Sequence, residues 1–248
     1  MLTDLVTVHH GHPRWQYCTQ MSSLLFGEVI SRLYMQSIPK ERQEEELKQV
    51  QSIFHLIKGN IIRKLNEITW LDPKTLILTK DKYCDSFWNF KRNSLQNLDE
   101  MGRGFNSQGV FENWWTPSDE KSFSNVSHCI KRQYVEHFRR PLKIDTRSIL
   151  IEVDGAFTLN ENICDVDGMN IVSDVLKDMS KNNFQDVVHL PNNPYPPVQL
   201  FFINIAQAYC SHIGPVSYIL YLELDEHSPN PERVDGFMMN AELFSNAF

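Results

Sequence analysis

Apolar residues recur at steps of three and four over residues 41–68, with Glu and Lys between them. This period matches the turn of an α-helix, so the pattern predicts a long amphipathic helix. Residues 21–35 carry a similar pattern, and Ile-Pro at residues 38–39 separates the two segments because proline cannot continue the preceding turn. After a helix stop at residues 71–73, a further helical pattern covers residues 83–98. The first part of the chain is therefore predicted to be helical.

Helix-start signals and one β-branched run organise the middle of the chain. Thr-Pro at residues 116–117 has the signature of an N-cap and a first helical position, which predicts a helix to about residue 138. Residues 149–153 predict a short strand. Asn160 resembles the N-cap of a helix that continues to Met179.

The last third alternates between helical and irregular patterns. Residues 190–197, rich in Pro and Asn, predict a loop, and residues 200–210 predict a mostly buried helix. From Asp225 onward we expect a loop-rich tail that ends in a helix at residues 241–247. The fold class predicted from these patterns is mostly α with minor β.

Composition and charge narrow the class of protein. The 248 residues are 42% apolar and 22% charged, which is typical of a globular protein with a sizeable core. A net charge of -7 without clustered Lys and Arg argues against nucleic-acid binding. No apolar run approaches the roughly 20 residues of a membrane span, and the N-terminus lacks the pattern of a signal peptide.

The five cysteines show no Cys-x-x-Cys spacing, and an odd number cannot all pair within one chain. They are interpreted as buried free thiols, or as cysteines whose former partners lie in sequence that this chain does not contain. The set is Cys18, Cys84, Cys129, Cys164 and Cys210.

Distinctive strings of residues are spread over most of the chain. They are WxxC at residues 15–18, GxxxxRLY at 27–34, TWLDxxT at 69–75, GRGFN at 102–106, WWT at 114–116, CxxxQY at 129–134, DGxxTLxENIxD at 154–165, QLFFxxxAQxxC at 199–210, DxHSPxxxRV at 225–234 and NAELFSxAF at 240–248. In this order and spacing, the chain resembles the neprilysin and endothelin-converting enzyme family of zinc metallopeptidases. The resemblance implies a truncated thermolysin-like catalytic lobe in residues 101–248, preceded by part of a helical region in residues 1–100.

The resemblance also assigns site residues. In that family, two histidines of a His-Glu-x-x-His helix and the Glu of the ENIAD string hold zinc. Glu161 would be the remaining third ligand, and Asp165 the carboxylate that orients a ligand histidine. His227 matches the histidine that stabilises the oxyanion, with Asp225 behind it and Arg233 contacting substrate.

No His-Glu-x-x-His occurs in the 248 residues. Residues 83–98 resemble a helix well upstream of that motif, whereas the string at residues 102–106 belongs just downstream of it, so we expect a deletion near residues 98–102. An ungapped alignment would instead place residues 92–96, RNSLQ, at the motif, which supplies no ligand either. One carboxylate does not hold zinc, because catalytic sites use three protein ligands.

These considerations predict a catalytically inactive pseudo-peptidase that binds no zinc, although zinc is the cofactor of the family. The alternative is a zinc-dependent endopeptidase of small peptides whose missing ligands come from another chain or a fuller transcript. The family cleaves peptides and is extracellular or membrane-anchored. For this chain we expect an unknown protein or peptide partner, and its compartment stays open.

Several weaker signals have simpler interpretations. Without the resemblance, Glu161 and Asp165 would be acids at a solvated helix start. The histidines at residues 9–12 are an incidental cluster, and the tryptophans at residues 114–115 are core residues. Basic pairs are interpreted as solvated charges at helix ends, and cysteines at family disulfide positions as unpaired. The basic pairs are Lys131-Arg132 and Arg139-Arg140, and the cysteines are Cys18, Cys129 and Cys210.

Overall fold

The fold comes from a computed structural model that describes residues 13–88, 102–106, 108–181 and 194–248. These residues belong to two compact units, which divide between His55 and Leu56. The elements are helices and a single two-stranded sheet within the described ranges, which confirms the predicted mostly α class with minor β. The predicted division of the chain at residue 100 stays a prediction.

Two helices occupy the start of the described chain. Helix α2 (Arg14–Leu25) and helix α3 (Gly27–Ser37) take the place of the single helix predicted over residues 21–35, so that prediction was wrong in extent. The break lies at Phe26, whose backbone leaves the helical region at φ -128° and ψ 33°. The N–H of Phe26 donates to the carbonyl of Ser22 and thereby closes α2.

Helix α4 (Lys40–Glu67) confirms the long amphipathic helix. Ile61 and Leu65 form a small buried cluster on its second half. Helix α5 (Pro73–Trp88) begins at its proline, where the missing N–H removes no intrahelical bond. The helix predicted over residues 83–98 overlaps the end of α5, and its remainder lies outside the described residues.

A capping box starts helix α6 (Pro117–His137), as the Thr-Pro signature predicts. The Thr116 hydroxyl accepts from the N–H of Asp119, and the Asp119 carboxylate accepts from the N–H of Thr116. The same buried carboxylate accepts from the Thr75 hydroxyl at 2.6 Å and from the N–H of Asp72 at 2.7 Å. It therefore joins the start of α5 to the start of α6.

A β-hairpin follows α6. Strand β1 (Arg139–Ile144) pairs antiparallel with strand β2 (Arg147–Glu152), with Arg140 opposite Ile151. The predicted strand is thus confirmed as β2. Its partner β1 was not predicted, because it contains Pro141, which an edge strand tolerates.

The hairpin is anchored to the helices through a buried carboxylate. Arg140 pairs with Glu232 at 3.0 Å, and the Tyr218 hydroxyl donates to the same Glu232 oxygen at 2.6 Å. Arg140 also lies over the Tyr218 ring at 4.7 Å. Arg139 and Arg140 are exposed, as interpreted, but their expected place at a helix end was wrong, because both lie in strand β1 and Arg139 pairs with Glu152 at 3.1 Å.

Five helices complete the fold. Helix α9 was not predicted. Helix α10 contradicts the expected loop-rich tail: its proline lies in the first turn, where proline is tolerated. The helix over residues 200–210 is buried on one face only, whereas the final helix is confirmed. The five are α7 (Leu159–Lys181), α8 (Pro197–Ala208), α9 (Pro215–Leu224), α10 (Asn230–Met239) and α11 (Glu242–Ala247).

Helix α7 begins one residue before the N-cap predicted at Asn160. The turn before it is fixed instead by Asp154, whose side chain accepts from the N–H groups of Ala156 and Phe157. Thr158 adds a hydrogen bond from its hydroxyl to the carbonyl of Asp154. The entry into α7 is therefore a tight, hydrogen-bonded turn.

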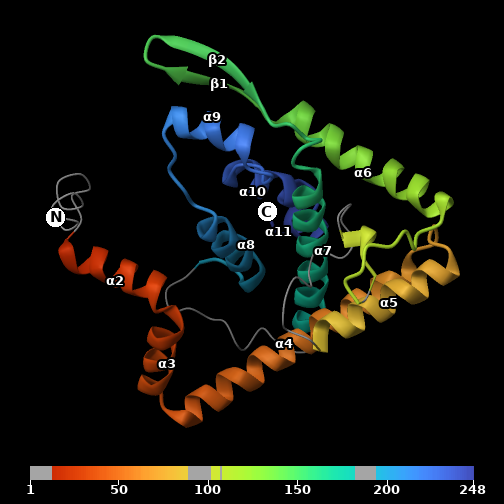
Figure 1. Ribbon diagram of the computed structural model, residues 1–248, viewed down its shortest axis with the longest axis horizontal. Helices are drawn as coiled ribbons and strands as arrows, with labels where there is room; N and C mark the ends of the chain where they lie inside the picture. The colour runs from red at the N-terminus through yellow and green to blue at the C-terminus, as the bar shows by residue number, and fades with distance from the viewer. Residues whose placement is uncertain (1–12, 89–101, 107, 182–193) are drawn as a thin grey trace. The chain divides into compact units, whose positions relative to one another are not determined.

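The main core lies between α7, α8 and α10, which Figure 1 shows gathered beside α11. Its most buried side chains are Val166, Phe202 and Phe237. Helix α10 also approaches α6 closely, because a Cβ at Gly236 would overlap the hydroxyl of the fully buried Tyr134. Glycine is therefore needed at this crossing, which positions the residues of α10 against α6 and α7.

Three cysteines are free and exposed: Cys18, Cys129 and Cys210. The interpretation as buried thiols was wrong for these three, since each lies at the surface of its own helix or helix end. The side chain of Cys84 lies outside the described residues. Among the described helices, none is long and apolar enough to cross a membrane.

Candidate functional site

Helix α7 presents two carboxylates one turn apart, and the first of them contacts a histidine. Glu161 Oε2 lies 3.0 Å from His227 Nε2. The Glu161 side chain is only 15% exposed, whereas that of His227 is 35% exposed. His227 comes from the turn between α9 and α10, so two segments distant in sequence meet here.

The other nitrogen of the His227 ring faces a second carboxylate. Nδ1 lies 2.8 Å from Asp225 Oδ1, and the backbone N–H of His227 donates to the same oxygen at 2.9 Å. The backbone hydrogen bond and the ring together hold the pKa of Asp225 below its usual value. The histidine is thereby fixed between two acidic side chains.

The second carboxylate of α7 is fully engaged with an arginine. Arg233 donates to Asp165 through Nε at 2.6 Å and through Nη2 at 2.7 Å, a bidentate arrangement. The side chains are 11% exposed for Asp165 and 17% for Arg233. The hydrogen bond to Asp165 raises the pKa of Arg233 further above its ordinary value, so this arginine stays charged. Its guanidinium also lies 5.1 Å from the centre of the Tyr209 ring.

Two fully buried polar residues support these contacts, and the sequence interpretation missed both. The Ser228 hydroxyl donates to Asn162 at 2.7 Å, and the Asn162 amide donates to the Thr158 hydroxyl at 2.8 Å. They fasten the turn that carries His227 to the start of α7. The available signal was position, because each directly follows a predicted site residue.

We call Glu161, Asp165, Asp225, His227 and Arg233 the carboxylate cluster. Each of these five predicted site residues therefore contacts another member of the cluster. The first and last members, Glu161 and Arg233, are 72 positions apart along the chain. Their assigned roles as zinc ligand, oxyanion stabiliser and substrate contact stay predictions. Elsewhere, residues 9–12 lie outside the described part of the chain.

The prediction that the tryptophan pair belongs to the core is confirmed for Trp115. Trp115 is buried and packs edge-to-face on Trp114 and Phe123. Trp114 is half-buried and donates from its indole nitrogen to the carbonyl of Phe105 at 3.2 Å.

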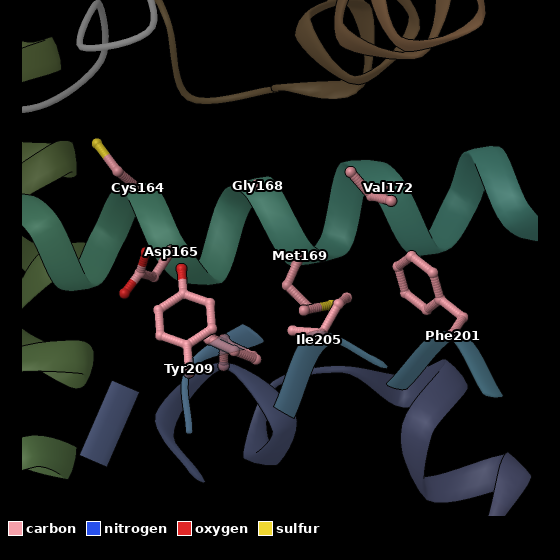
Figure 2. Close-up of a pocket in the computed structure, with 9 residues that line it drawn as sticks. Cys164, Asp165, Gly168, Met169, Val172, Phe201, Ile205 and Tyr209 are labelled. Atoms are coloured by element: carbon pink, nitrogen blue, oxygen red, sulfur yellow. The ribbon is translucent and has the colours of Figure 1, made fainter. Parts of the chain in front are cut away.

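An apolar pocket of about 290 Å³ adjoins the carboxylate cluster at Asp165. Figure 2 shows Met169 pointing from α7 toward Ile205, while the ring of Phe201 on α8 and that of Tyr209, directly after α8, point toward α7. The hydroxyl end of Tyr209 lies beside Asp165. The pocket is lined by Cys164, Asp165, Gly168, Met169, Val172, Phe201, Ile205, Tyr209 and Phe237.

We tested whether the cluster fits a zinc ion. A catalytic zinc needs three protein ligands with room for a water. Glu161 contacts His227, and both carboxylate oxygens of Asp165 accept hydrogen bonds from Arg233. Across the described ranges, no group of three His, Cys, Asp or Glu side chains could hold a metal ion. These side chains therefore do not fit a catalytic zinc centre.

Comparison with known proteins identifies the family to which the chain is similar. Residues 95–248 match the sequence profile of Peptidase family M13, and residues 4–84 match a second profile of the same description. The chain is 31% identical to Neprilysin-3 of Drosophila melanogaster and 32% identical to human Neprilysin, in each case over 151 residues and 61% of this chain. It spans only 18% and 19% of the length of those relatives.

Solved structures show the same fold. The zinc metalloprotease Zmp1 of Mycobacterium tuberculosis, in its open state, superimposes with a TM-score of 0.71 over 98% of this chain and 51% of that protein, at 16% identity. PepO from Lactobacillus rhamnosis superimposes with a TM-score of 0.60 over 81% of this chain and 44% of that protein, also at 16% identity. Members of the matched family are zinc-dependent and act on peptides. The chain, by its family profiles, belongs to peptidase family M13.

Proposed function

We propose that this chain is a non-hydrolytic member of peptidase family M13, which binds peptides or protein segments without cleaving them. The observation that carries the proposal is the direct contact of Glu161 with His227 at 3.0 Å, in a sequence that contains no His-Glu-x-x-His. The residue assigned as the third zinc ligand thus contacts a protein side chain through its Oε2. The loss of the zinc helix near residues 98–102 is part of this proposal.

The electrostatics of the carboxylate cluster support the same view. Hydrolysis by this family depends on a metal that makes a bound water acidic. Here both oxygens of Asp165 accept from Arg233, and Glu161 and Asp225 each present one oxygen to His227. The cluster instead serves to tie the turn at His227 and the start of α10 to α7.

Peptide turnover tests the hydrolytic half of the proposal. Purified protein with added zinc is assayed on fluorogenic peptides, and Glu161→Gln is the matched control. We expect no cleavage above background by either protein. Cleavage that a chelator abolishes and that Glu161→Gln removes would overturn the proposal and support the alternative, in which ligands come from a companion chain. Cleavage equal in both proteins identifies a contaminating peptidase, because removing the assigned ligand leaves it unchanged.

The apolar pocket beside Asp165 supports the binding half. Its volume of about 290 Å³ is at the lower end for a ligand pocket and suits one large apolar side chain of a peptide. Asp165 in its lining places a polar group, which is paired with Arg233, next to the apolar wall, and this suits a peptide backbone beside an apolar side chain.

Filling the pocket tests this binding. Gly168 lines it, and a Cβ there would meet no atom within 4 Å, so Gly168→Leu inserts a side chain into the pocket. Gly59→Leu on α4 is the matched control, because it is also a helical glycine in open space but lies outside the pocket. Titration with capped Phe and Leu dipeptides should show binding that Gly168→Leu abolishes and Gly59→Leu retains. Equal binding by both variants would place the peptide elsewhere.

A further inference from the structure

A second pocket, unrelated to the carboxylate cluster, lies along helix α6. Its volume is about 190 Å³, and α6 contributes residues at positions that share one helical face. We call it the α6 pocket, and its polar and aromatic lining is Arg103, Phe123, Ser124, Ser127, His128 and Lys131. Leu159, the first residue of α7, closes it.

The charge of the α6 pocket is one-sided. Arg103, Lys131 and His128 line it, and none of the described lining residues is acidic. Within the part of the chain that the structure describes, neither the Lys131 ammonium nor the His128 ring has an ion pair. The whole protein carries a net charge of -7, so this concentration of basic groups runs against the overall charge. Such a pocket attracts an anion.

Arg103 is held in place by aromatic rings. Its guanidinium lies 5.1 Å from the centre of the Phe123 ring and 5.8 Å from that of the buried Trp115. Stacking of this kind fixes the plane of the guanidinium. A fixed donor loses less conformational entropy when a ligand binds, so Arg103 is prepared for an oxyanion.

The wall opposite α6 is also fixed. A Cβ at Gly155 would overlap the carbonyl of Lys131, so glycine allows the turn before α7 to press against α6 at this point. That contact brings the N-terminus of α7, which carries a positive partial charge, to the edge of the pocket at Leu159. The Ser127 hydroxyl donates to the Ser124 carbonyl at 3.2 Å, which stabilises the α6 side.

From these features we infer that the α6 pocket binds a phosphate-type oxyanion, either free or as the terminal group of a small molecule. A cavity of about 190 Å³ is smaller than the roughly 300 Å³ at which pockets begin to enclose drug-sized ligands, so it suits one charged group. Arginine binds such groups through two parallel N–H donors, and lysine adds a point charge. The inference does not depend on whether the chain hydrolyses peptides.

Calorimetric titration with inorganic phosphate, at constant ionic strength, tests the inference. We expect saturable binding at one site, with Lys131→Gln weakening it at least about tenfold. Lys121→Gln is the matched control, because it removes the same charge from the same helix outside the pocket and should change affinity less than about twofold. A parallel titration with phenyl phosphate distinguishes the two sources: tighter binding than that of phosphate indicates a small molecule, and equal or weaker binding indicates the free ion.

Two results would overturn the inference. One is the absence of saturable binding of either phosphate compound to the unchanged protein. The other is equal weakening by Lys131→Gln and Lys121→Gln, which would show a general effect of net charge. Arg103→Lys keeps the charge but removes the planar donor pair, so it should also weaken binding. The thermal unfolding midpoint of each variant without phosphate shows whether its fold is retained.

Discussion

The carboxylate cluster and the α6 pocket both include a residue at the start of α7, Glu161 and Leu159 respectively, but their charged side chains are arranged differently. In the cluster, Asp165 and Arg233 satisfy each other, and Glu161 and Asp225 share one histidine. In the α6 pocket, three of the lining residues that the structure describes are basic and none of those described is acidic. A region whose charges are paired internally contributes to the architecture, whereas a region with an excess of one sign is where an external ion is expected.

The two regions also differ in how well the family resemblance describes them. Every member of the carboxylate cluster falls within a family string, and the resemblance assigns it a role in catalysis or metal binding. Two residues that line the α6 pocket have no such role. Lys131 was interpreted as a surface charge, and His128 was given no role. The two proposals therefore have different origins: that for the carboxylate cluster starts from the family resemblance, and that for the α6 pocket starts from the structure.

Breaking the Asp165–Arg233 pair should give the largest effect. Asp165→Asn leaves the mostly buried guanidinium without its counter-ion, so we expect the free energy of unfolding to fall by about 3 kcal/mol. The double variant Asp165→Asn with Arg233→Met should lose less than the sum of the two single losses, because both remove one interaction. Urea unfolding measures all four proteins.

An exposed pair provides the comparison. Arg132 and Glu136 lie 3.8 Å apart on α6 with side chains 64% and 59% exposed, so Arg132→Met should cost less than about 0.5 kcal/mol. Equal costs for the two pairs, or additive costs in the double variant at Asp165 and Arg233, would show that the cluster contributes nothing beyond surface charge.

Widening the crossing of α10 and α6 should have the next largest effect. In Gly236→Ala, the new methyl group overlaps the hydroxyl of Tyr134, which is fully buried and has little room to move. We expect a loss of about 1–3 kcal/mol in the free energy of unfolding. Gly59→Ala, in open space on α4, should instead stabilise by about 0.5–1 kcal/mol. Equal stability of the two variants would mean that α10 does not pack on α6 in this way.

A smaller, pH-dependent effect concerns the start of α6. Burial favours the protonated form of Asp119, but hydrogen bonds from Thr75, Asp72 and Thr116 outweigh it and lower the pKa of this carboxyl below its usual value. A lowered folded pKa contributes stability that is present above the unfolded value near 3.9 and is lost as pH falls through the folded pKa. The stability of the protein should therefore decline below about pH 4 in part through this group.

Thr75→Val isolates this contribution. It removes one hydrogen bond to Asp119, so the pKa of Asp119 should rise and the difference in stability between pH 6 and pH 3 should shrink by about 1 kcal/mol. Urea unfolding at several pH values measures this difference. An unchanged pH dependence would show that the Thr75 hydrogen bond does not act on the ionised carboxylate.

The sequence predicted the parts of the fold that have strong local signals. The amphipathic period of α4 and the Thr-Pro start of α6 were sufficient because local chemistry and tertiary structure agree there. Strand β1 and helix α10 were missed because each contains one proline, a residue that usually interrupts such elements but is tolerated on an edge strand or in a first helical turn.

The residues of the carboxylate cluster were predicted only through the family resemblance. No local pattern indicates that Glu161 lies beside His227, since 66 positions separate them. The support from Asn162 and Ser228 depends on the same long-range contact. The α6 pocket was not predicted because its cations gather only when η1 (Gly102–Gly104), α6 and the start of α7 come together.

The central claim is that Glu161 serves as a partner of His227 and does not hold a zinc ion. Titration of the purified protein with zinc in the presence of a mild competing chelator, followed by metal analysis after dialysis, tests it most directly. The account predicts no stoichiometric zinc in the unchanged protein and the same result for Glu161→Gln. One equivalent of zinc that survives dialysis and disappears in Glu161→Gln would contradict it.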